Sequence, residues 1–358
     1  MMKLLELTRL YYPSVGGAER FVRDRLRLYD QLGIEYKLIT TDFSTEKKDN
    51  TVPVDNVVYL KQYTPFNITP SLIFQLNGTY DVVSINFIGR FFSDVALALL
   101  NKRKQKIILT PYFGFHTPRF SPVKSFYERT IFPLLLGRID ALVALTQYEK
   151  DFWIQRFRVP ERKIHRIPPF IEKDVVPVSM NAVGDPYILY IGRAGGNKKT
   201  DLLLKTFLSL RSLPYTLVMT IRPEDIDASL RAAVSQDRRI RLKGFVTERE
   251  KHDLLSGAEA LIFPTSWESF GYVGLEASQH RKPVLCSDIP VLREVLDPRG
   301  VIFFQNTDEA LQEALLKFSS LQENDKKRMG ECNYANLERY SAEVSLRQYR
   351  EMFDSIHG

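Results

Sequence analysis

The sequence has few of the residues that mark a disulfide-bonded, metal-binding or membrane-spanning protein. Its 358 residues include two cysteines, Cys286 and Cys332, whose spacing matches no metal motif and gives no reason to expect a disulfide. No apolar run approaches the roughly 18 to 20 residues that cross a bilayer. The first residues also lack the layout of a signal peptide. We therefore expect a cytoplasmic protein in a reducing compartment.

Two motifs of nucleotide chemistry are missing as well. No Gly-x-Gly-x-x-Gly follows the first predicted strand, which argues against an NAD-dependent epimerase or dehydrogenase. No Asp-x-Asp stands at the end of a predicted strand to hold a divalent cation, and we expect no metal.

The charge of the chain permits several kinds of anionic partner. Lysine and arginine exceed aspartate and glutamate by 50 to 43, a formal charge of +7. This excess suits nucleotide diphosphates, anionic lipid surfaces or nucleic acid, and does not choose among them. The densest basic run, residues 102–106, is either a solvated helix end or a point of peripheral contact with an anionic membrane.

Short apolar runs alternate with helical patterns in two series, which is typical of a doubly wound α/β protein. The first series of predicted strands comprises residues 3–7, 36–40, 82–85, 107–109 and 141–144; the second comprises residues 187–191, 216–220, 240–242, 260–263, 284–286 and 301–304. A proline-punctuated stretch, residues 167–186, separates the series. We predict two Rossmann-like domains, residues 1–172 and 173–341.

In the most informative segment, residues 264–277, one carboxylate precedes a predicted helix start and another follows it. Glu268 follows the predicted strand 260–263, and Glu276 lies about two turns into a helix that begins near Phe270 and Gly271. Ligands of open α/β sheets bind at the carboxyl ends of strands, and the first N–H groups of a helix favour an anion. A ligand with a phosphate and several hydroxyls would suit this segment.

The two glutamates, separated by seven residues and followed by Lys282-Pro-Val, resemble the signature of retaining nucleotide-sugar glycosyltransferases of family 4. Four further segments resemble this family in the same order: residues 13–19, residues 190–203, Gly244-Phe-Val246 and residues 287–294. The resemblance covers nearly the whole chain except residues 42–80 and the C-terminal tail. It implies the GT-B fold, with the last helix, about 342–358, packed back on the first domain.

The resemblance also implies an activity. A sugar would move, with retention at the anomeric carbon and without a metal, from a nucleotide-diphosphate sugar to a hydroxyl of a glycan or lipid-linked saccharide. Nucleic acid is not an expected partner. A catalytically inactive protein that binds sugar nucleotides or glycans with the same fold is the alternative.

Glycine-rich turns at two predicted strand ends supply candidates for donor binding. Gly16 and Gly17 would let the backbone approach a diphosphate, although a simple loop is the other interpretation. Gly192 opens a second loop that carries Arg193 and Lys198. These two cations would neutralise the leaving diphosphate, whereas the alternative is surface solvation.

The resemblance assigns distinct roles to the two glutamates. Glu276 would accept hydrogen bonds from the ribose hydroxyls, and Glu268 would lie near the donor sugar and its developing positive charge. The backbone N–H groups of Phe270, Gly271 and Tyr272 would meet the sugar or diphosphate. In the alternative reading the carboxylates are a charged loop residue and a helix cap.

His116, in the loop after the predicted strand 107–109, is the candidate for the family histidine that contacts the donor sugar. Related sequences often carry that histidine earlier in the loop, where this chain has Tyr112 or Gly114, so a structural role is the alternative. Two other departures are Pro169 in place of asparagine and Lys199 where the family often has glycine.

Overall fold

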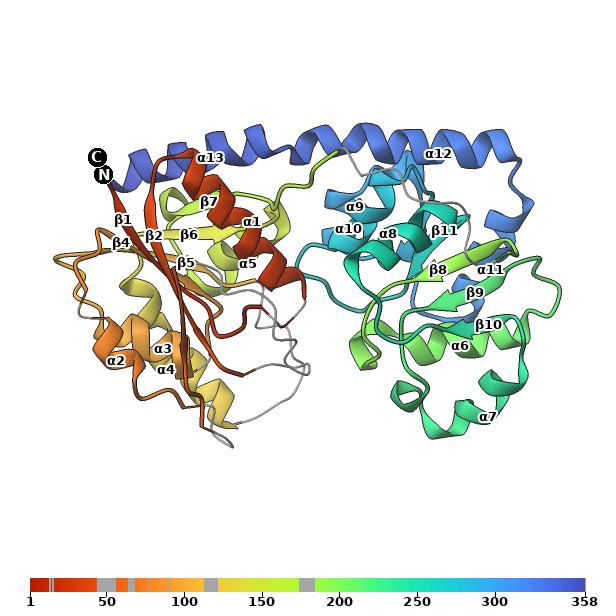
Figure 1. The fold of residues 1–358 in the computed structure, drawn as a ribbon, viewed down its shortest axis with the longest axis horizontal. Helices are drawn as coiled ribbons and strands as arrows, with labels where there is room; N and C mark the ends of the chain where they lie inside the picture. Colours follow the sequence, from red (N-terminus) through yellow and green to blue (C-terminus); the bar gives the residue numbers. More distant parts are fainter. Residues whose placement is uncertain are drawn as a thin grey trace. The chain divides into compact units, whose positions relative to one another are not determined.

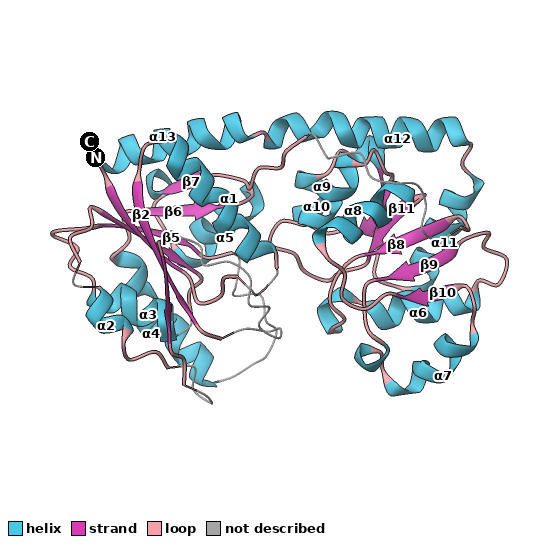
Figure 2. Ribbon diagram, viewed as in Figure 1, coloured by secondary structure: helices cyan, strands magenta, loops and turns pink. Residues whose placement is uncertain are grey.

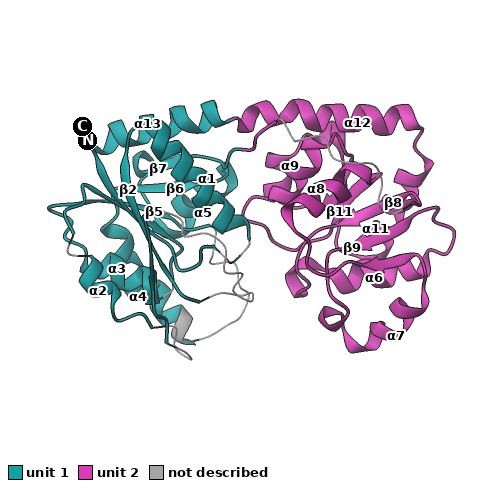
Figure 3. Ribbon diagram, in the orientation of Figure 1, with its two compact units in different colours: residues 1–170, 342–358 teal, residues 171–341 magenta. Residues whose placement is uncertain are grey.

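A computed structural model describes most of the chain (Figure 1). The described residues are 1–12, 14, 16–43, 56–63, 68–76, 78–89, 91–112, 122–173 and 184–357, without the side chains of residues 123 and 124. The chain forms two compact units, residues 1–170 with 342–358 and residues 171–341 (Figure 3). The sequence places the boundary near residue 172.

The first unit is built on a seven-stranded sheet in which all paired strands are parallel. The spatial order is β3-β2-β1-β4-β5-β6-β7. The strands are β1 (Lys3–Leu7), β2 (Glu35–Thr41), β3 (Val57–Leu60), β4 (Val82–Asn86), β5 (Lys106–Thr110), β6 (Ala141–Ala144) and β7 (Ile164–Arg166). The sequence did not predict β3 and β7, which are the two edge strands and are partly exposed.

Helices cover both faces of this sheet (Figure 2). They are α1 (Gly17–Gln31), α2 (Leu72–Gln75), α3 (Phe91–Leu99), α4 (Pro122–Gly137), α5 (Gln147–Phe157) and α13 (Ala342–His357). Side chains of α3, α4 and α5 share one apolar core with the sheet, including the fully buried Phe132 and Trp153. On α13, the ring of Tyr349 lies 6.2 Å from that of Tyr29 on α1, and Ser345 donates a hydrogen bond to the Pro168 carbonyl.

The second unit repeats this architecture with six parallel strands, in the order β10-β9-β8-β11-β12-β13. They are β8 (Tyr187–Tyr190), β9 (Thr216–Met219), β10 (Ile240–Leu242), β11 (Ala260–Phe263), β12 (Val284–Ser287) and β13 (Val301–Phe304). Two doubly wound sheets confirm the predicted fold class. In each, the direction of winding reverses next to the first strand, between β1 and β4 and between β8 and β11.

Seven helices of the second unit are α6 (Thr200–Ser209), α7 (Ala228–Gln236), α8 (Glu248–Gly257), α9 (Tyr272–Gln279), α10 (Pro290–Val295), α11 (Asp308–Ser320) and α12 (Glu323–Asn336). One core is formed between the sheet and side chains of α6, α7 and α11. Among all described residues of the chain, none of the helices has the length and apolar character to cross a membrane.

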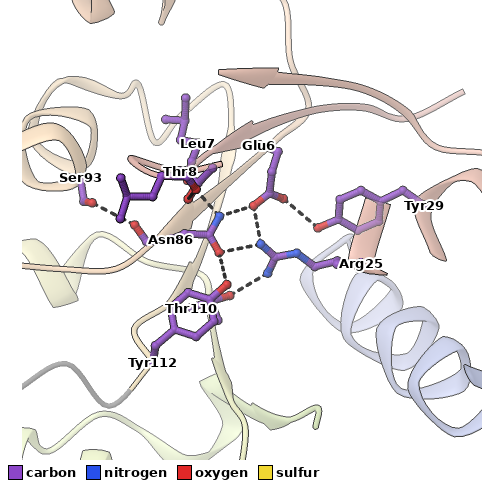
Figure 4. Close-up of polar contacts among 10 residues, drawn as sticks. Glu6, Leu7, Thr8, Arg25, Tyr29, Asn86, Ser93, Thr110 and Tyr112 are labelled. Carbon is purple, nitrogen blue, oxygen red and sulfur yellow. Dashed lines mark hydrogen bonds and ion pairs between the residues drawn. The ribbon is translucent and has the colours of Figure 1, made fainter. Parts of the chain in front are cut away.

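A buried polar network lies where the winding of the first sheet reverses, next to β1 and β4 (Figure 4). Arg25 of α1 is 1% exposed and forms an ion pair with Glu6 of β1. It also donates to Asn86 Oδ1 at 2.7 Å and Thr110 Oγ1 at 2.9 Å, at the ends of β4 and β5. Burial is the largest single effect on the pKa of Arg25 and would lower it, but the Glu6 carboxylate together with three neighbouring tyrosines raises the pKa well above its ordinary value.

We expect Arg25→Met to destabilise the first unit by about 3 to 5 kcal/mol, because Glu6 is left as a buried charge without its cation. Urea unfolding followed by the fluorescence of Trp153, which lies in the core of this unit, measures the effect. The matched control is Arg27→Met on the exposed face of the same helix, which should cost less than about 0.5 kcal/mol. Equal losses in the two variants would contradict the interpretation.

Candidate functional site

Two loops meet where the winding of the second sheet reverses. Residues 191–199 follow β8 and residues 264–271 follow β11, which is its parallel neighbour. Lys198 of the first loop forms an ion pair with Glu268 of the second. Their side chains are 31% and 14% exposed, so the pair is accessible to a ligand without being fully solvated. The structure therefore brings together two residues that the sequence proposed separately.

Hydrogen bonds of backbone and side-chain groups hold these loops together. Ser266 N–H and Thr265 Oγ1 both donate to the Asn197 carbonyl, at 2.7 and 3.1 Å. Thr265 N–H donates to Ser287 Oγ at the end of β12, and Asn306 Nδ2 donates to the Thr265 carbonyl. Ser287 ends the buried strand β12, and Thr265 and Asn306 each lie two residues after a buried strand. A small polar residue at or shortly after a strand end is the sequence signal that these three residues share.

Gly271 sets the start of α9, as the sequence predicted for Phe270 and Gly271. It has a φ of +86°, and an added Cβ would lie 2.5 Å from Leu292 Cδ2, so both conformation and space favour glycine. The Phe270 ring is buried against Tyr340, with ring centroids 5.5 Å apart. At the start of α9, the N–H groups of Tyr272 and Val273 have no acceptor four residues earlier within the helix, while Gly274 N–H donates to the Gly271 carbonyl at 3.0 Å. This is the geometry that favours an anion.

The other cation of the β8 loop is presented differently. Arg193 is exposed, and no ion pair of its guanidinium is found among the described residues. Its carbonyl accepts a hydrogen bond from the Tyr190 hydroxyl at 3.0 Å. Burial, and then the charge of Glu268, raise the pKa of that hydroxyl. Lys199 has a φ of +48°, a conformation that favours glycine, which explains physically why related sequences often have glycine there.

Glu276 has a different partner from Glu268. It lies on α9 with 7% of its side chain exposed, and Lys251 Nζ of α8 is 2.6 Å from its Oε1. The same ammonium lies 2.9 Å from Glu248. The sequence analysis did not single out Lys251, because a lysine in a charged helical stretch is typical of a solvated surface.

A histidine pair lies beside this lysine. His252 of α8 and His280, directly after α9, have their Nδ1 and Nε2 atoms 2.9 Å apart. Burial, and then the charges of His252, Lys282 and Lys251, lower the pKa of His280 to about 4. Because only one of the facing nitrogens can carry the proton between them, the contact requires a neutral ring.

In the first unit, Gly16 caps α1 in an extended conformation and Gly17 is the first helical residue. The carboxylate of Glu19 lies against Gly16, where a diphosphate was expected. Tyr112 and Phe87 have positive φ values of 52° and 65° and lie just after β5 and β4, with ring centroids 4.8 Å apart. Strained backbone of this kind is often found at binding sites. His116 lies outside the described residues.

In the described parts of both units, no cluster of three or more histidine, cysteine, aspartate or glutamate side chains could hold a metal ion.

Models of two protein families match two adjoining parts of the chain. The model described as Glycosyltransferase Family 4 matches residues 15–175, and that described as Glycosyl transferases group 1 matches residues 175–335. The chain is a family 4 glycosyltransferase of the GT-B fold. This confirms the resemblance carried by the glutamate segment and the glycine-rich loops.

Named relatives and solved structures agree with this assignment. A GDP-mannose:cellobiosyl-diphosphopolyprenol alpha-mannosyltransferase of Komagataeibacter xylinus is 24% identical, covering 82% of this chain and 77% of the relative. A protein of the same name from Xanthomonas oryzae is 22% identical, covering 100% and 98%. The structure of a sucrose-phosphate synthase from Thermosynechococcus elongatus has a TM-score of 0.80 at 14% identity, covering 100% of this chain and 99% of the synthase, which shows the fold.

We predict that the second unit loses stability as the pH falls from about 6.5 toward 4. His280 has a folded-state pKa of about 4, below the ordinary value of 6.5, so the unfolded chain binds more protons in this window. The slope approaches about 1.4 kcal/mol per pH unit for one such group. Urea unfolding at several pH values, followed by Trp267 fluorescence, would measure it.

In His280→Gln the slope should become shallower. His357→Gln, at an exposed position of the first unit, is the control and should leave the slope unchanged. A slope that is the same in wild type and His280→Gln would refute the assignment.

Proposed function

We propose that this glycosyltransferase moves a sugar from a nucleotide-diphosphate sugar to a hydroxyl of a glycan or lipid-linked saccharide, with retention at the anomeric carbon and without a divalent metal. The observation that carries the proposal is the Lys198–Glu268 ion pair at the winding reversal of the second sheet. It combines a cation for the diphosphate and a carboxylate for the sugar in the crevice where such sheets bind ligands.

Three sources of positive charge would assist departure of the nucleotide diphosphate. Lys198 and the exposed Arg193 come from the β8 loop, and the N-terminus of α9 comes from the β11 loop. Lys198 supplies a point charge, while the Arg193 guanidinium can bind two phosphate oxygens at once. These groups would perform the charge neutralisation that a metal performs in other sites, which supports metal independence.

Glu268 would bind hydroxyls of the donor sugar and stabilise the positive charge that develops at its anomeric carbon. Retaining glycoside hydrolases use two carboxyl groups about 5 to 5.5 Å apart for a double displacement. Here Glu268 and Glu276 are held by different lysines from different elements. This arrangement favours a reaction on a single face of the donor sugar. We propose His116 as a further contact to that sugar.

We propose a mannosyl group as the sugar, a GDP-linked donor and a diphosphopolyprenol-linked saccharide as the acceptor. The names of the two relatives support this choice, since each denotes transfer from GDP-mannose to such an acceptor. Glu276 would accept hydrogen bonds from the ribose hydroxyls, and the backbone at Gly16 and Gly17 would contact the diphosphate after displacement of the Glu19 carboxylate. Binding without transfer is the competing function.

Cytoplasmic contact with an anionic membrane would bring the enzyme to a lipid-linked acceptor. The three neighbouring helices α2, α3 and α4 expose large apolar side chains, namely Ile73, Phe74, Phe91, Leu99, Phe126, Ile131 and Leu134. The turn after α3 adds the exposed cations Lys102, Arg103 and Lys104. Apolar groups interspersed with cations suit the interface of an anionic bilayer.

Donor use can be tested by incubating the protein with GDP-mannose, UDP-glucose, ADP-glucose and TDP-glucose, with a diphosphopolyprenol-linked disaccharide and with or without EDTA. We expect GDP release from GDP-mannose, unchanged by EDTA, and an α-mannosidic product by NMR. Lys198→Met should lower kcat about 10²- to 10³-fold, as expected for loss of one group that stabilises transition-state charge.

Lys205→Met, at an exposed position of α6, is the matched control and should retain full activity. Strict dependence on Mg²⁺ or Mn²⁺ would refute the metal-independent mechanism, and a β-linked product would refute retention. Nucleotide binding without release in any mixture would favour the inactive alternative.

Membrane contact can be tested by sedimentation with vesicles. We expect binding to phosphatidylglycerol vesicles and little binding to phosphatidylcholine. Phe126→Ser combined with Leu134→Ser should weaken binding about 10-fold or more, because each buried apolar side chain contributes about 1.5 to 3 kcal/mol. The control is Leu316→Ser, an exposed leucine of α11 in the second unit, which should not change binding. Equal binding by all variants would contradict the proposed surface.

A further inference from the structure

Lys251 is a buried cation at the edge of the candidate donor site. It lies in the first turns of α8, which follows β10, while its partner Glu276 lies in the second turn of α9, which follows β11. Strands β10 and β11 belong to one parallel sheet, so the N-terminal turns of both helices lie toward the edge that carries the β8 and β11 loops. The lysine is 9% exposed, although most lysines lie on the surface.

The contacts of this ammonium group are directed and specific. Lys251 Nζ is 2.6 Å from Glu276 Oε1 and 2.9 to 3.0 Å from the two oxygens of Glu248. The side chain of Glu248 is 55% exposed and that of Glu276 is 7% exposed, so the lysine joins a solvated carboxylate to a buried one. One N–H of Lys251 therefore donates to Glu276, the carboxylate that is proposed to bind the ribose hydroxyls.

Stability alone is a weak reason for such a pair. Apolar residues of similar volume commonly replace a buried ion pair without loss of stability. The neighbouring Leu254 and Leu255 of α8 are buried, so an apolar residue would suit this face of the helix. A carboxylate that binds two adjacent hydroxyls, in contrast, must keep its plane in one orientation, which a fixed hydrogen bond to one oxygen provides.

We propose that Lys251 is a positioning residue for nucleotide binding, holding the Glu276 carboxylate in the orientation that accepts hydrogen bonds from the ribose hydroxyls. The inference rests on the proposed role of Glu276. Lys251 does not itself contact the nucleotide. Its removal therefore weakens the part of the affinity that depends on the ribose hydroxyls and leaves the diphosphate contacts intact.

The test compares the affinity of the full chain for GDP and for 2′-deoxy-GDP by calorimetry. Hydrogen bonds to a charged group correspond to about a 10- to 100-fold preference of the wild type for GDP. In Lys251→Met this preference should fall below about 3-fold, mainly through weaker GDP binding. In the transfer reaction, KM for the donor should rise about 10-fold while kcat changes less than about 3-fold.

Lys326→Met is a matched control. Lys326 of α12 is also 9% exposed, belongs to the same unit and is paired with a glutamate three residues before it, as Lys251 is. Its loss should cost comparable stability and leave the GDP preference unchanged. If Lys251→Met behaves as Lys326→Met does, lower in stability but with the full preference for GDP, the proposal is overturned. Tighter GDP binding by Lys251→Met would also overturn it, since the lysine would then compete with ribose.

Glu276→Gln separates this proposal from the proposed function. If this variant keeps the full preference for GDP, Glu276 does not bind ribose and the role assigned to it fails. If it loses the preference while Lys251→Met keeps it, only the positioning role fails.

If Lys251→Met fails to fold, the double variant Lys251→Met with Glu276→Gln provides the test. In it, the buried carboxylate of Glu276 is replaced by a neutral amide and so is not left without its cation. Its GDP affinity should equal that of Glu276→Gln within about 3-fold. A further 10-fold loss would show that Lys251 contacts the nucleotide directly, which contradicts the proposal.

Discussion

The Lys198–Glu268 ion pair depends on the order of strands in the second sheet. The two residues are 70 positions apart in the chain, yet their loops follow β8 and β11, which are adjacent and parallel. Because the winding reverses at this point, no crossing helix fills the space beyond the strand ends. The loops can then face one another, and Thr265 Oγ1 and Ser266 N–H link them by donating hydrogen bonds to the Asn197 carbonyl.

The two units use the same winding order for different purposes. In the first unit the reversal between β1 and β4 is filled by the buried ion pair of Arg25 and Glu6, and Asn86 forms a hydrogen bond with each of them. In the second unit the corresponding pair remains partly exposed. A buried pair held by further hydrogen bonds fixes one arrangement of the surrounding segments, whereas an accessible pair can exchange its partner for a ligand. This contrast supports the donor site on the second unit.

The interface between α8 and α9 extends the candidate site away from the strand ends. It contains the Lys251–Glu276 ion pair and the neutral contact between His252 and His280. Both contacts join the same two helices, so the position of Glu276 depends on the packing of α8 as well as on its own helix. Burial lowers the pKa of His280 to about 4, and protonation would oppose this packing. The orientation of the Glu276 carboxylate is thus coupled to the protonation of His280 at the interface between α8 and α9.

The sequence by itself determined the fold class, most strands and the location of the loops that carry the candidate site. Buried strands such as residues 260–263 are local apolar runs, and the start of α9 follows from Gly271, so neighbouring residues suffice to recognise them. The edge strand β7 was missed because Ile164–Arg166 contains one apolar residue, and β3 was missed although Val57–Leu60 is a short apolar run. Which side chains become partners was decided by the tertiary structure. Lys251 meets Glu276, and Lys198 meets Glu268, only because strand order and helix packing bring distant segments together, and no local pattern records that geometry.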